Sequence, residues 1–159
     1  MRRTVIGCAA ALAVSVVLAT APAALAQDMT GFVKARQGFM DQQQKDVNAI
    51  AAYGKGEGDQ ATALQRIKEL IAMAPKITGY FENDPETSST AMPKVSSARP
   101  EIWQSFDKFK AIIPMLQAQE NKLRAAIESG DPHATMTALA SMYRNGCGAC
   151  HTDYRAPKS

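Results

Sequence analysis

This sequence has no strong excess of charge of either sign. Its 18 Lys and Arg residues against 15 Asp and Glu give a net charge of +3 over 159 residues. That imbalance is too small to indicate a nucleic-acid surface or a polybasic membrane-binding segment. Internal repeats, low-complexity tracts and sustained period-two alternation of apolar residues are also absent from the chain. The length therefore favours one domain of ordinary size.

Long apolar runs are missing too, except at the N-terminus. Arg2 and Arg3 precede a predominantly apolar stretch, and Ala24-Leu25-Ala26 supplies the small residues that a signal peptidase needs. We therefore expect residues 1–26 to be a cleaved secretory signal peptide and residues 27–159 to be the mature protein. Cleavage removes two basic residues and no acidic one, which leaves 16 against 15, or +1. We expect this mature protein to be periplasmic and soluble, without a membrane span.

Two other interpretations of the N-terminus are weaker. A retained membrane anchor needs about 20 apolar residues, and this run is shorter and ends in a cleavage pattern. A lipoprotein needs its cysteine at the cleavage point, whereas Cys8 lies close to the start of the apolar run. Removal of Cys8 leaves two cysteines, Cys147 and Cys150. In the compartment that receives exported proteins, these thiols are expected to be oxidised or otherwise occupied.

The mature chain has four segments in which apolar residues recur at the spacings of three and four that amphipathic helices need. The first runs from about Asp28 to Tyr53 and ends at a cluster of glycines. The second follows Asp59, a candidate N-cap, and ends before Pro75. We expect these two helices to form an antiparallel pair.

The third and fourth segments occupy the C-terminal part of the chain. The third opens at Pro100 and ends at Gly130, with apolar residues three or four apart, or seven where one core position is polar. Pro114 predicts a kink between Lys110 and Pro114. The fourth has Asp131 as its N-cap. Its expected inner face consists of Met136, Leu139, Tyr143, Cys147, Cys150 and Tyr154.

Residues 82–99 separate the second and third segments. They are rich in Ser, Thr and Pro without a sustained period, which predicts a long surface loop. A disordered linker between two domains is the alternative, but too few helices flank it on either side to build separate cores. We therefore predict an all-α fold, an antiparallel up-down-up-down four-helix bundle.

One motif near the C-terminus carries chemistry. Cys147-Gly148-Ala149-Cys150-His151 has the C-x-x-C-H order by which c-type haem is attached. The two thiols add across the two vinyl groups at one edge of the porphyrin, and the imidazole of the next residue binds the iron. On a helix these side chains are three and four residues apart and project to one side. We predict one covalent haem c, with Cys147 and Cys150 as thioethers and His151 as the proximal axial iron ligand.

Two competing interpretations of the motif are weaker. A thiol-exchange site would need its cysteines at the head of a helix in a βαβ setting, whereas this chain is helical throughout. A structural zinc site needs four ligands. The only other histidine, His133, lies 14 residues before Cys147, which is about 21 Å along one helix. That distance also prevents His133 from serving as a second axial ligand, and we expect it to be a solvated first-turn residue.

The sixth iron position decides between functions, because it can hold a methionine, hold another group or stay open. Seven methionines remain after cleavage. In an up-down-up-down bundle the end of the fourth helix lies at the same end as the start of the first helix and the end of the second. Geometry alone therefore leaves three candidates: Met29, Met40 and Met73.

Arg36 lies on the apolar stripe of the first segment, four residues before Met40. A buried arginine is unfavourable without an anionic partner, and a haem propionate is such a partner. The other interpretation is an arginine that extends to the edge of the bundle with its charge in water. The sequence favours neither.

Three pieces of the sequence carry a family resemblance: Arg36 to Met40, Ala98 to Trp103, and Cys147 to His151 with Tyr154 and Arg155. In these pieces the chain resembles the cytochrome c′ family, class II of the c-type cytochromes, whose members are four-helix bundles with haem near the C-terminus. The resemblance implies that Met40 faces the distal side of the iron and that Arg36 and Arg155 lie near the haem propionates. It also implies one of two functions, since some members bind small gases at an open iron and others carry electrons.

Our first hypothesis is a periplasmic electron-transfer protein with His151 and Met40 as iron ligands, because a methionine thioether raises the reduction potential of haem iron. Its partners would be redox proteins of the periplasm. The alternative is a high-spin, five-coordinate haem protein that binds nitric oxide or carbon monoxide. In both cases we expect no enzymatic activity, and either a monomer or a homodimer.

Overall fold

A computed structural model of the chain describes residues 21–82 and 84–157, with side chains from Met29 onward. Within these residues the chain is helical, and its β structure is limited to one isolated bridge between Ala98 and Arg155. Residues 1–20 of the expected signal peptide, Cys8 among them, lie outside the described part. The predicted all-α fold class is confirmed.

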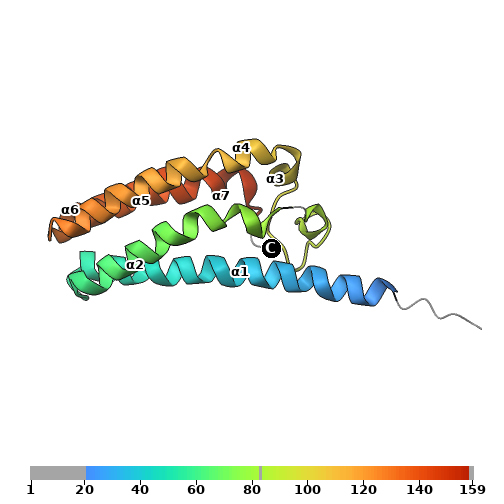
Figure 1. Ribbon diagram of the computed structural model, residues 1–159, viewed down its shortest axis with the longest axis horizontal. Helices are drawn as coiled ribbons and strands as arrows, with labels where there is room; N and C mark the ends of the chain where they lie inside the picture. Colours follow the sequence, from blue (N-terminus) through green and yellow to red (C-terminus); the bar gives the residue numbers. More distant parts are fainter. Residues whose placement is uncertain (1–20, 83, 158–159) are drawn as a thin grey trace, which may run out of the picture.

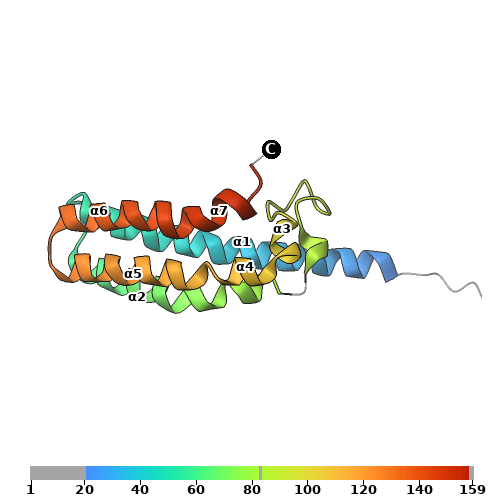
Figure 2. The same ribbon diagram turned by 90° about the horizontal axis from the view of Figure 1, so that it is seen from above.

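Four helical arms run along the long axis of the molecule (Figures 1 and 2). The first two are α1 (Ala21–Gly54) and α2 (Gln60–Met73). The third consists of α3 (Glu101–Gln104), α4 (Phe106–Lys110) and α5 (Ile113–Glu128), and the fourth of α6 (Pro132–Met142), the π-helical turn η4 (Tyr143–Cys147) and α7 (Gly148–Tyr154). Contacts join α1 to α2, α2 to α5, α5 to α6 and α6 to α1, which closes an up-down-up-down bundle. The first turns of α1 extend beyond the other arms (Figure 2).

The helix ends follow from local side-chain chemistry. Asp59 Oδ1 accepts a hydrogen bond from the backbone N–H of Thr62 at 2.8 Å, and Asp131 Oδ1 accepts one from the N–H of His133 at 2.8 Å. Both residues are therefore the N-caps that the sequence predicts. After α5, Gly130 adopts a φ of +74°, a conformation that a side chain disfavours, and the chain reverses there.

The core lies between the four arms. Its fully buried side chains include Ile50, Ile67, Ile102, Phe109, Leu123 and Ile127. Burial of one such side chain stabilises the fold by roughly 1.5–3 kcal/mol. Phe109 also packs edge-on against Phe81 and Tyr154, with ring centroids 5.0 and 5.3 Å apart. These contacts join the third arm to the segment that follows α2 and to the end of the fourth arm.

The third arm is interrupted twice. The predicted kink is confirmed, since α4 ends at Lys110 and α5 begins at Ile113, one residue before Pro114. The sequence does not predict the second break, at Ser105, where the backbone leaves the helical region (φ −140°, ψ 51°). It lies beside Trp103, whose indole N–H donates to the carbonyl of Phe81 at 2.6 Å.

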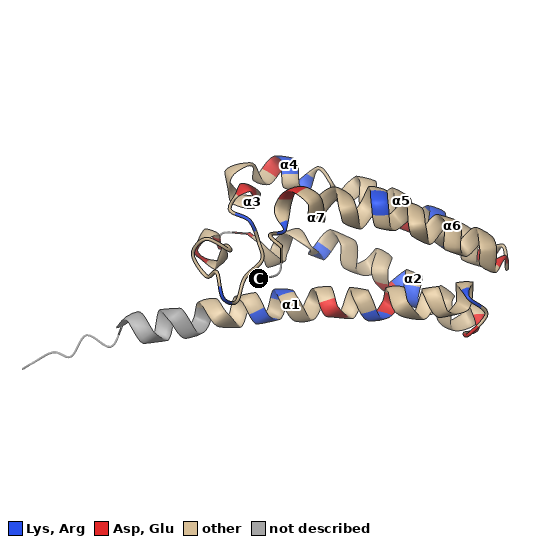
Figure 3. Cartoon of the chain, turned by 180° about the vertical axis from the view of Figure 1, so that it is seen from behind, with Lys and Arg blue, Asp and Glu red and all other residues tan. Residues whose placement is uncertain are grey.

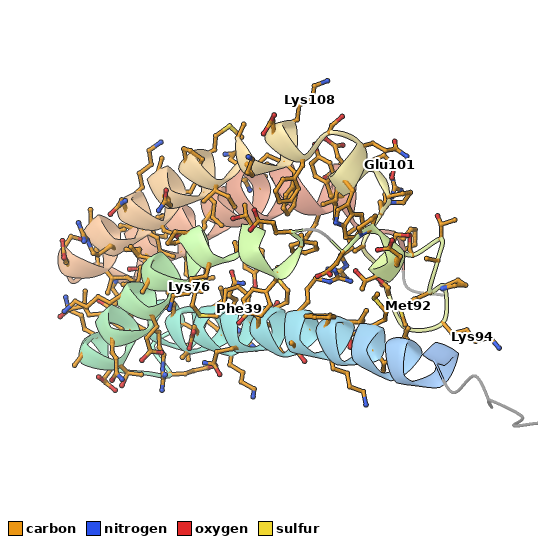
Figure 4. The ribbon with its side chains drawn as sticks, turned by 45° about the vertical axis from the view of Figure 1, so that its right-hand side comes forward. Phe39, Lys76, Met92, Lys94, Glu101 and Lys108 are labelled. Carbon is orange, nitrogen blue, oxygen red and sulfur yellow. The ribbon has the colours of Figure 1, made fainter. Side chains whose placement is uncertain are left out.

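Residues 82–99 are only in part the surface loop that the sequence predicts. The chain there contains a short 3₁₀ turn, η3 (Pro85–Thr87), and four of its residues are buried: Thr87, Ser88, Ser96 and Ala98. The end of the loop is tied to the end of the chain, because Arg99 N–H donates to Tyr154 O at 3.0 Å and Ala156 N–H to Ser97 O at 2.8 Å. Figure 4 shows Met92 and Lys94 on the part of the loop that lies against α1.

Tyr143, on the expected inner face of the fourth arm, is 42% exposed and lines a cavity at the end of the bundle. Leu139 is buried as predicted, and Thr135 and Met142, which the sequence prediction does not include, are buried along α6 as well. The π-helical turn that follows contains more residues per turn than an α-helix, so it shifts the inward face by about one residue. After it, Cys147, Cys150 and Tyr154 pack against the core, as the sequence predicts.

Charged side chains of both signs are interspersed along the described arms (Figure 3). Ion pairs join Arg66 to Glu69 and Lys110 to Asp107, each with a nitrogen–oxygen distance of 2.8 Å. Lys108 and Glu101 point away from the bundle (Figure 4). In the described part of the chain, no helix combines the length and apolar character that a bilayer crossing requires.

Candidate haem site

A cavity of about 710 Å³ lies at the end of the bundle where the fourth arm terminates. This volume is within the roughly 300–1,000 Å³ of ligand and cofactor sites. Side chains from α1, the loop before α3, the third arm and the fourth arm line it. All six residues that the sequence predicts for the site are among them: Arg36, Met40, Cys147, Cys150, His151 and Arg155.

The fourth arm positions the C-x-x-C-H motif at the cavity. Cys147 ends the π-helical turn, and Cys150 and His151 lie on α7. Just before the motif, a Cβ on Gly146 would lie 2.9 Å from Leu116 Cδ1, so a larger residue there would require the Leu116 side chain to move. The close approach holds the motif against the cavity.

The two cysteines are half-buried and form no disulfide. Burial raises the pKa of Cys147, with a smaller contribution from the charge of Glu120, and burial raises the pKa of Cys150 to about 12. Cysteines that exchange disulfides have lowered pKa values, because the thiolate is the attacking species. The setting of this pair therefore suits covalent attachment of a ligand better than thiol exchange.

His151 lines the cavity, and its exposed surface opens into it. Desolvation by the surrounding protein lowers its pKa, and the neighbouring charge of Arg155 lowers it further. The neutral imidazole is the form that binds a metal ion. Among the described residues, no cluster of three or more His, Cys, Asp or Glu side chains is placed to hold a metal ion by itself.

Met40 is the one of the three candidate methionines that lines the cavity; Met29 and Met73 do not. It is half-buried, and its sulfur accepts a hydrogen bond from Gln43 Nε2 at 3.4 Å. Beside it on α1, Phe39 (labelled in Figure 4) stacks on Tyr80 with ring centroids 4.2 Å apart. Met142 also lines the cavity, but it belongs to the same arm as His151, about 13 Å before it along a helix.

Arg36 is buried, with 5% of its surface exposed, so it does not extend to solvent. Its guanidinium donates to Thr87 Oγ1 at 3.2 Å, to Thr87 O at 3.1 Å and to Ser96 Oγ at 3.1 Å. It also lies 4.7 Å from the centre of the Phe81 ring. Burial lowers its pKa, and the charge of Asp84 opposes this in part. These hydrogen bonds use three of its five N–H donors, and contact with a propionate stays a prediction.

Arg155 is exposed at the cavity and pairs with Ala98 in the isolated β-bridge. The bridge fixes the backbone of Arg155 beside the loop of residues 82–99. The same loop accepts the hydrogen bonds of Arg36 through Thr87 and Ser96. The structure therefore brings both predicted arginines to the same cavity from opposite ends of the chain.

Glu120, on α5, is an ionisable cavity residue that the sequence prediction does not include. Its surface is 1% exposed, and its Oε2 has no hydrogen-bond partner among the described residues. Burial raises its pKa to about 7. The sequence does contain a signal for Glu120, which is the polar residue that interrupts the apolar stripe between Leu116 and Leu123.

A four-helix bundle with C-x-x-C-H at the end of its last arm, facing a ligand-sized cavity, defines a c-type cytochrome of the helical-bundle class. A family model described as Cytochrome C′ matches residues 31–155, and the chain belongs to the cytochrome c′ family. Proteins of this family bind covalent haem c with iron. The two free thiols and the imidazole on the cavity wall fit that group: Cys147 and Cys150 would hold its edge and His151 its iron.

Relatives and solved structures agree with this assignment. A cytochrome c-556 from Agrobacterium tumefaciens is 33% identical over 129 residues, which cover 80% of this chain and 99% of the relative. A cytochrome c′ structure from Rhodobacter has a TM-score of 0.70 at 25% identity and covers 82% of this chain and 98% of its own. A nitric oxide complex of a cytochrome c prime variant from Alcaligenes xylosoxidans has a TM-score of 0.65 at 26% identity, with coverage of 79% and 94%.

Proposed function

We propose that this c-type cytochrome is a periplasmic electron-transfer protein whose haem iron is bound by His151 and Met40. The observation that carries the proposal is the position of Met40, the candidate methionine whose side chain lines the cavity that His151 also lines. When bound, the haem supplies a one-electron couple between ferric and ferrous iron. A thioether ligand favours the ferrous state and raises the potential.

The protein's own residues would hold the haem and shield it from water. Cys147 and Cys150 would hold the macrocycle edge, and His151 on the same arm would bind the iron. Apolar side chains such as Leu116 and Phe109 line the rest of the cavity and limit the access of water. Arg36 keeps the loop of residues 82–99 closed over one side of the cavity through its bonds to Thr87 and Ser96.

A second candidate function is gas binding at a five-coordinate iron. Two observations favour it: the Met40 sulfur is engaged by Gln43, and a structural relative of 26% identity is described as a nitric oxide complex. In that function Met40 would pack over an open iron position and restrict the size of the ligand that reaches it.

We also infer that the protein is not an enzyme, that its partners are redox proteins of the periplasm, and that it is a monomer or a homodimer. Export rests on the signal sequence, and the N-terminal sequence of purified protein tests it. A chain that starts at Gln27 supports export with cleavage, and a chain that starts at Met1 contradicts it.

Carbon monoxide separates the two functions. Titration of the ferrous holoprotein should leave its visible spectrum unchanged if Met40 occupies the sixth position. Formation of a stoichiometric carbon monoxide adduct at low gas concentration would contradict the electron-transfer proposal and support the alternative.

A further inference from the structure

A lone carboxyl group lies in the wall of the haem cavity. Glu120 projects from the middle of α5 and is 1% exposed, and its Oε2 has no hydrogen-bond partner among the described residues. A buried carboxylate without a partner is strongly unfavourable, so the group is stable there only as the neutral acid or beside a positive charge. A change of charge inside the cavity will therefore change the affinity of Glu120 for a proton.

Among the described residues, no ionisable side chain forms an ion pair with Glu120. The elements packed against α5 are α2, η1 (Ala74–Lys76), α6 and η4. Of these, only η4 contributes ionisable cavity residues, Tyr143 and Cys147. The ionisable cavity residues from α1 and from the end of the fourth arm are Arg36, Asp41, Cys150, His151, Tyr154 and Arg155. Arg124, one turn further along α5, pairs with Glu128 at 3.6 Å.

We propose that Glu120 is a redox-linked proton acceptor, which binds one proton when the haem is reduced and releases it when the haem is oxidised. This inference rests on the electron-transfer function proposed above. In the balanced step, one electron passes from a one-electron donor protein to the iron, and one proton from water forms an O–H bond with a carboxylate oxygen of Glu120. Re-oxidation reverses both transfers.

The direction of the coupling follows from Coulomb's law in a low-dielectric cavity. Ferric iron carries one more positive charge than ferrous iron, so it favours the carboxylate, and reduction favours the neutral acid. Burial without a charged partner raises the pKa of Glu120 to about 7, even before the charge of the iron is considered. This value lies within the physiological pH range. The cavity reaches solvent beside Asp41 and Gln44, which are exposed lining residues, so protons can exchange.

The test is a potentiometric titration of the purified holoprotein between pH 5 and 9. Wild-type protein should show a midpoint potential that falls as pH rises through neutrality. The slope should approach, at its steepest, about 59 mV for each tenfold fall in proton concentration. Glu120→Gln keeps the shape of the side chain and removes the titration, so its potential should be flat near neutrality. The control Glu57→Gln changes an exposed carboxyl in the loop after α1, away from the cavity, and should keep the wild-type slope.

A second measurement does not depend on the folding of a variant. The reduced-minus-oxidised infrared difference spectrum of wild-type protein should contain the C=O band of a carboxylic acid that gains its proton on reduction. A reversible couple with a pH-independent potential and no such band would overturn this inference alone. An unchanged slope in Glu120→Gln would do the same. If the ferrous protein instead forms a carbon monoxide adduct and shows no reversible couple, the electron-transfer function fails.

Discussion

The side-chain amide of Gln43 donates a hydrogen bond to the sulfur of Met40, with a nitrogen–sulfur distance of 3.4 Å. The two residues are one turn apart on α1, and both line the haem cavity. Thioether sulfur is a weak acceptor, so this contact can orient the methionine without holding it strongly. The proposed binding of Met40 to the iron would therefore need to replace only this weak hydrogen bond.

Replacement of Met40 by leucine tests that role with little change in volume. Met40→Leu should retain covalent haem and lose the spectral features of methionine ligation, because leucine has no donor atom. The matched control is Met73→Leu, since Met73 does not line the cavity. Absorption spectra of both variants provide the measurement, and an unchanged spectrum in Met40→Leu would mean that Met40 only packs against the haem.

Loss of either motif cysteine should leave little holoprotein. Cys147→Ser and Cys150→Ser each remove one of the thioether positions, and the cavity between the arms of the bundle then lacks the group that fills it. The yield of covalently bound haem after denaturation and extraction is the measurement. Cys8→Ser, in the expected signal peptide, should keep the wild-type yield. Recovery of a folded, colourless Cys147→Ser bundle at wild-type stability would contradict this prediction.

Arg36 should stabilise the fold as well as the cavity. Arg36→Ala removes the hydrogen bonds to Thr87 and Ser96 and leaves their buried oxygens without that donor. A destabilisation of about 2–4 kcal/mol is expected, because bonds to charged groups contribute roughly 1.5–3 kcal/mol each and are not additive. Chemical denaturation measures it, and limited proteolysis of residues 85–98 should accelerate. Lys34→Ala, an exposed change on the same helix, is the control, and equal effects of the two variants would argue against the loop contact.

Glu120 should also make stability depend on pH. Its pKa in the folded protein is raised from 4.5 to about 7 by burial, so the folded state binds the proton more tightly than the unfolded state. Stability from this group is complete below pH 4.5 and is lost as pH rises to about 7. The loss amounts to about 3 kcal/mol, at 1.36 kcal/mol for each pKa unit. Glu120→Gln should remove this decline in denaturation experiments at pH 5 and pH 8, and a decline of the same size in the variant would contradict it.

Local signals account for what the sequence predicts correctly. Side chains of Asp59 and Asp131 cap helices through contacts within three residues, and C-x-x-C-H is a continuous motif. The four-arm topology follows from apolar spacing and short connections. All six predicted site residues reach one cavity because they occupy the same end of that topology.

The features that the sequence does not predict depend on contacts between distant segments. The π-helical turn over Tyr143–Cys147 has no strong local signature. The composition of residues 82–99 predicts a polar surface loop. Thr87 and Ser96 are nevertheless buried, because they accept hydrogen bonds from Arg36, more than 50 residues away. Glu120 interrupts an otherwise apolar stripe, and only the fold shows that this position faces the cavity.

The ferric absorption spectrum of the purified holoprotein tests the central claim most directly, because it reports the sixth iron ligand. If His151 and Met40 both bind the iron, the spectrum is low-spin and contains the weak long-wavelength charge-transfer band of methionine sulfur bound to ferric iron. A high-spin ferric spectrum without that band would contradict the electron-transfer account.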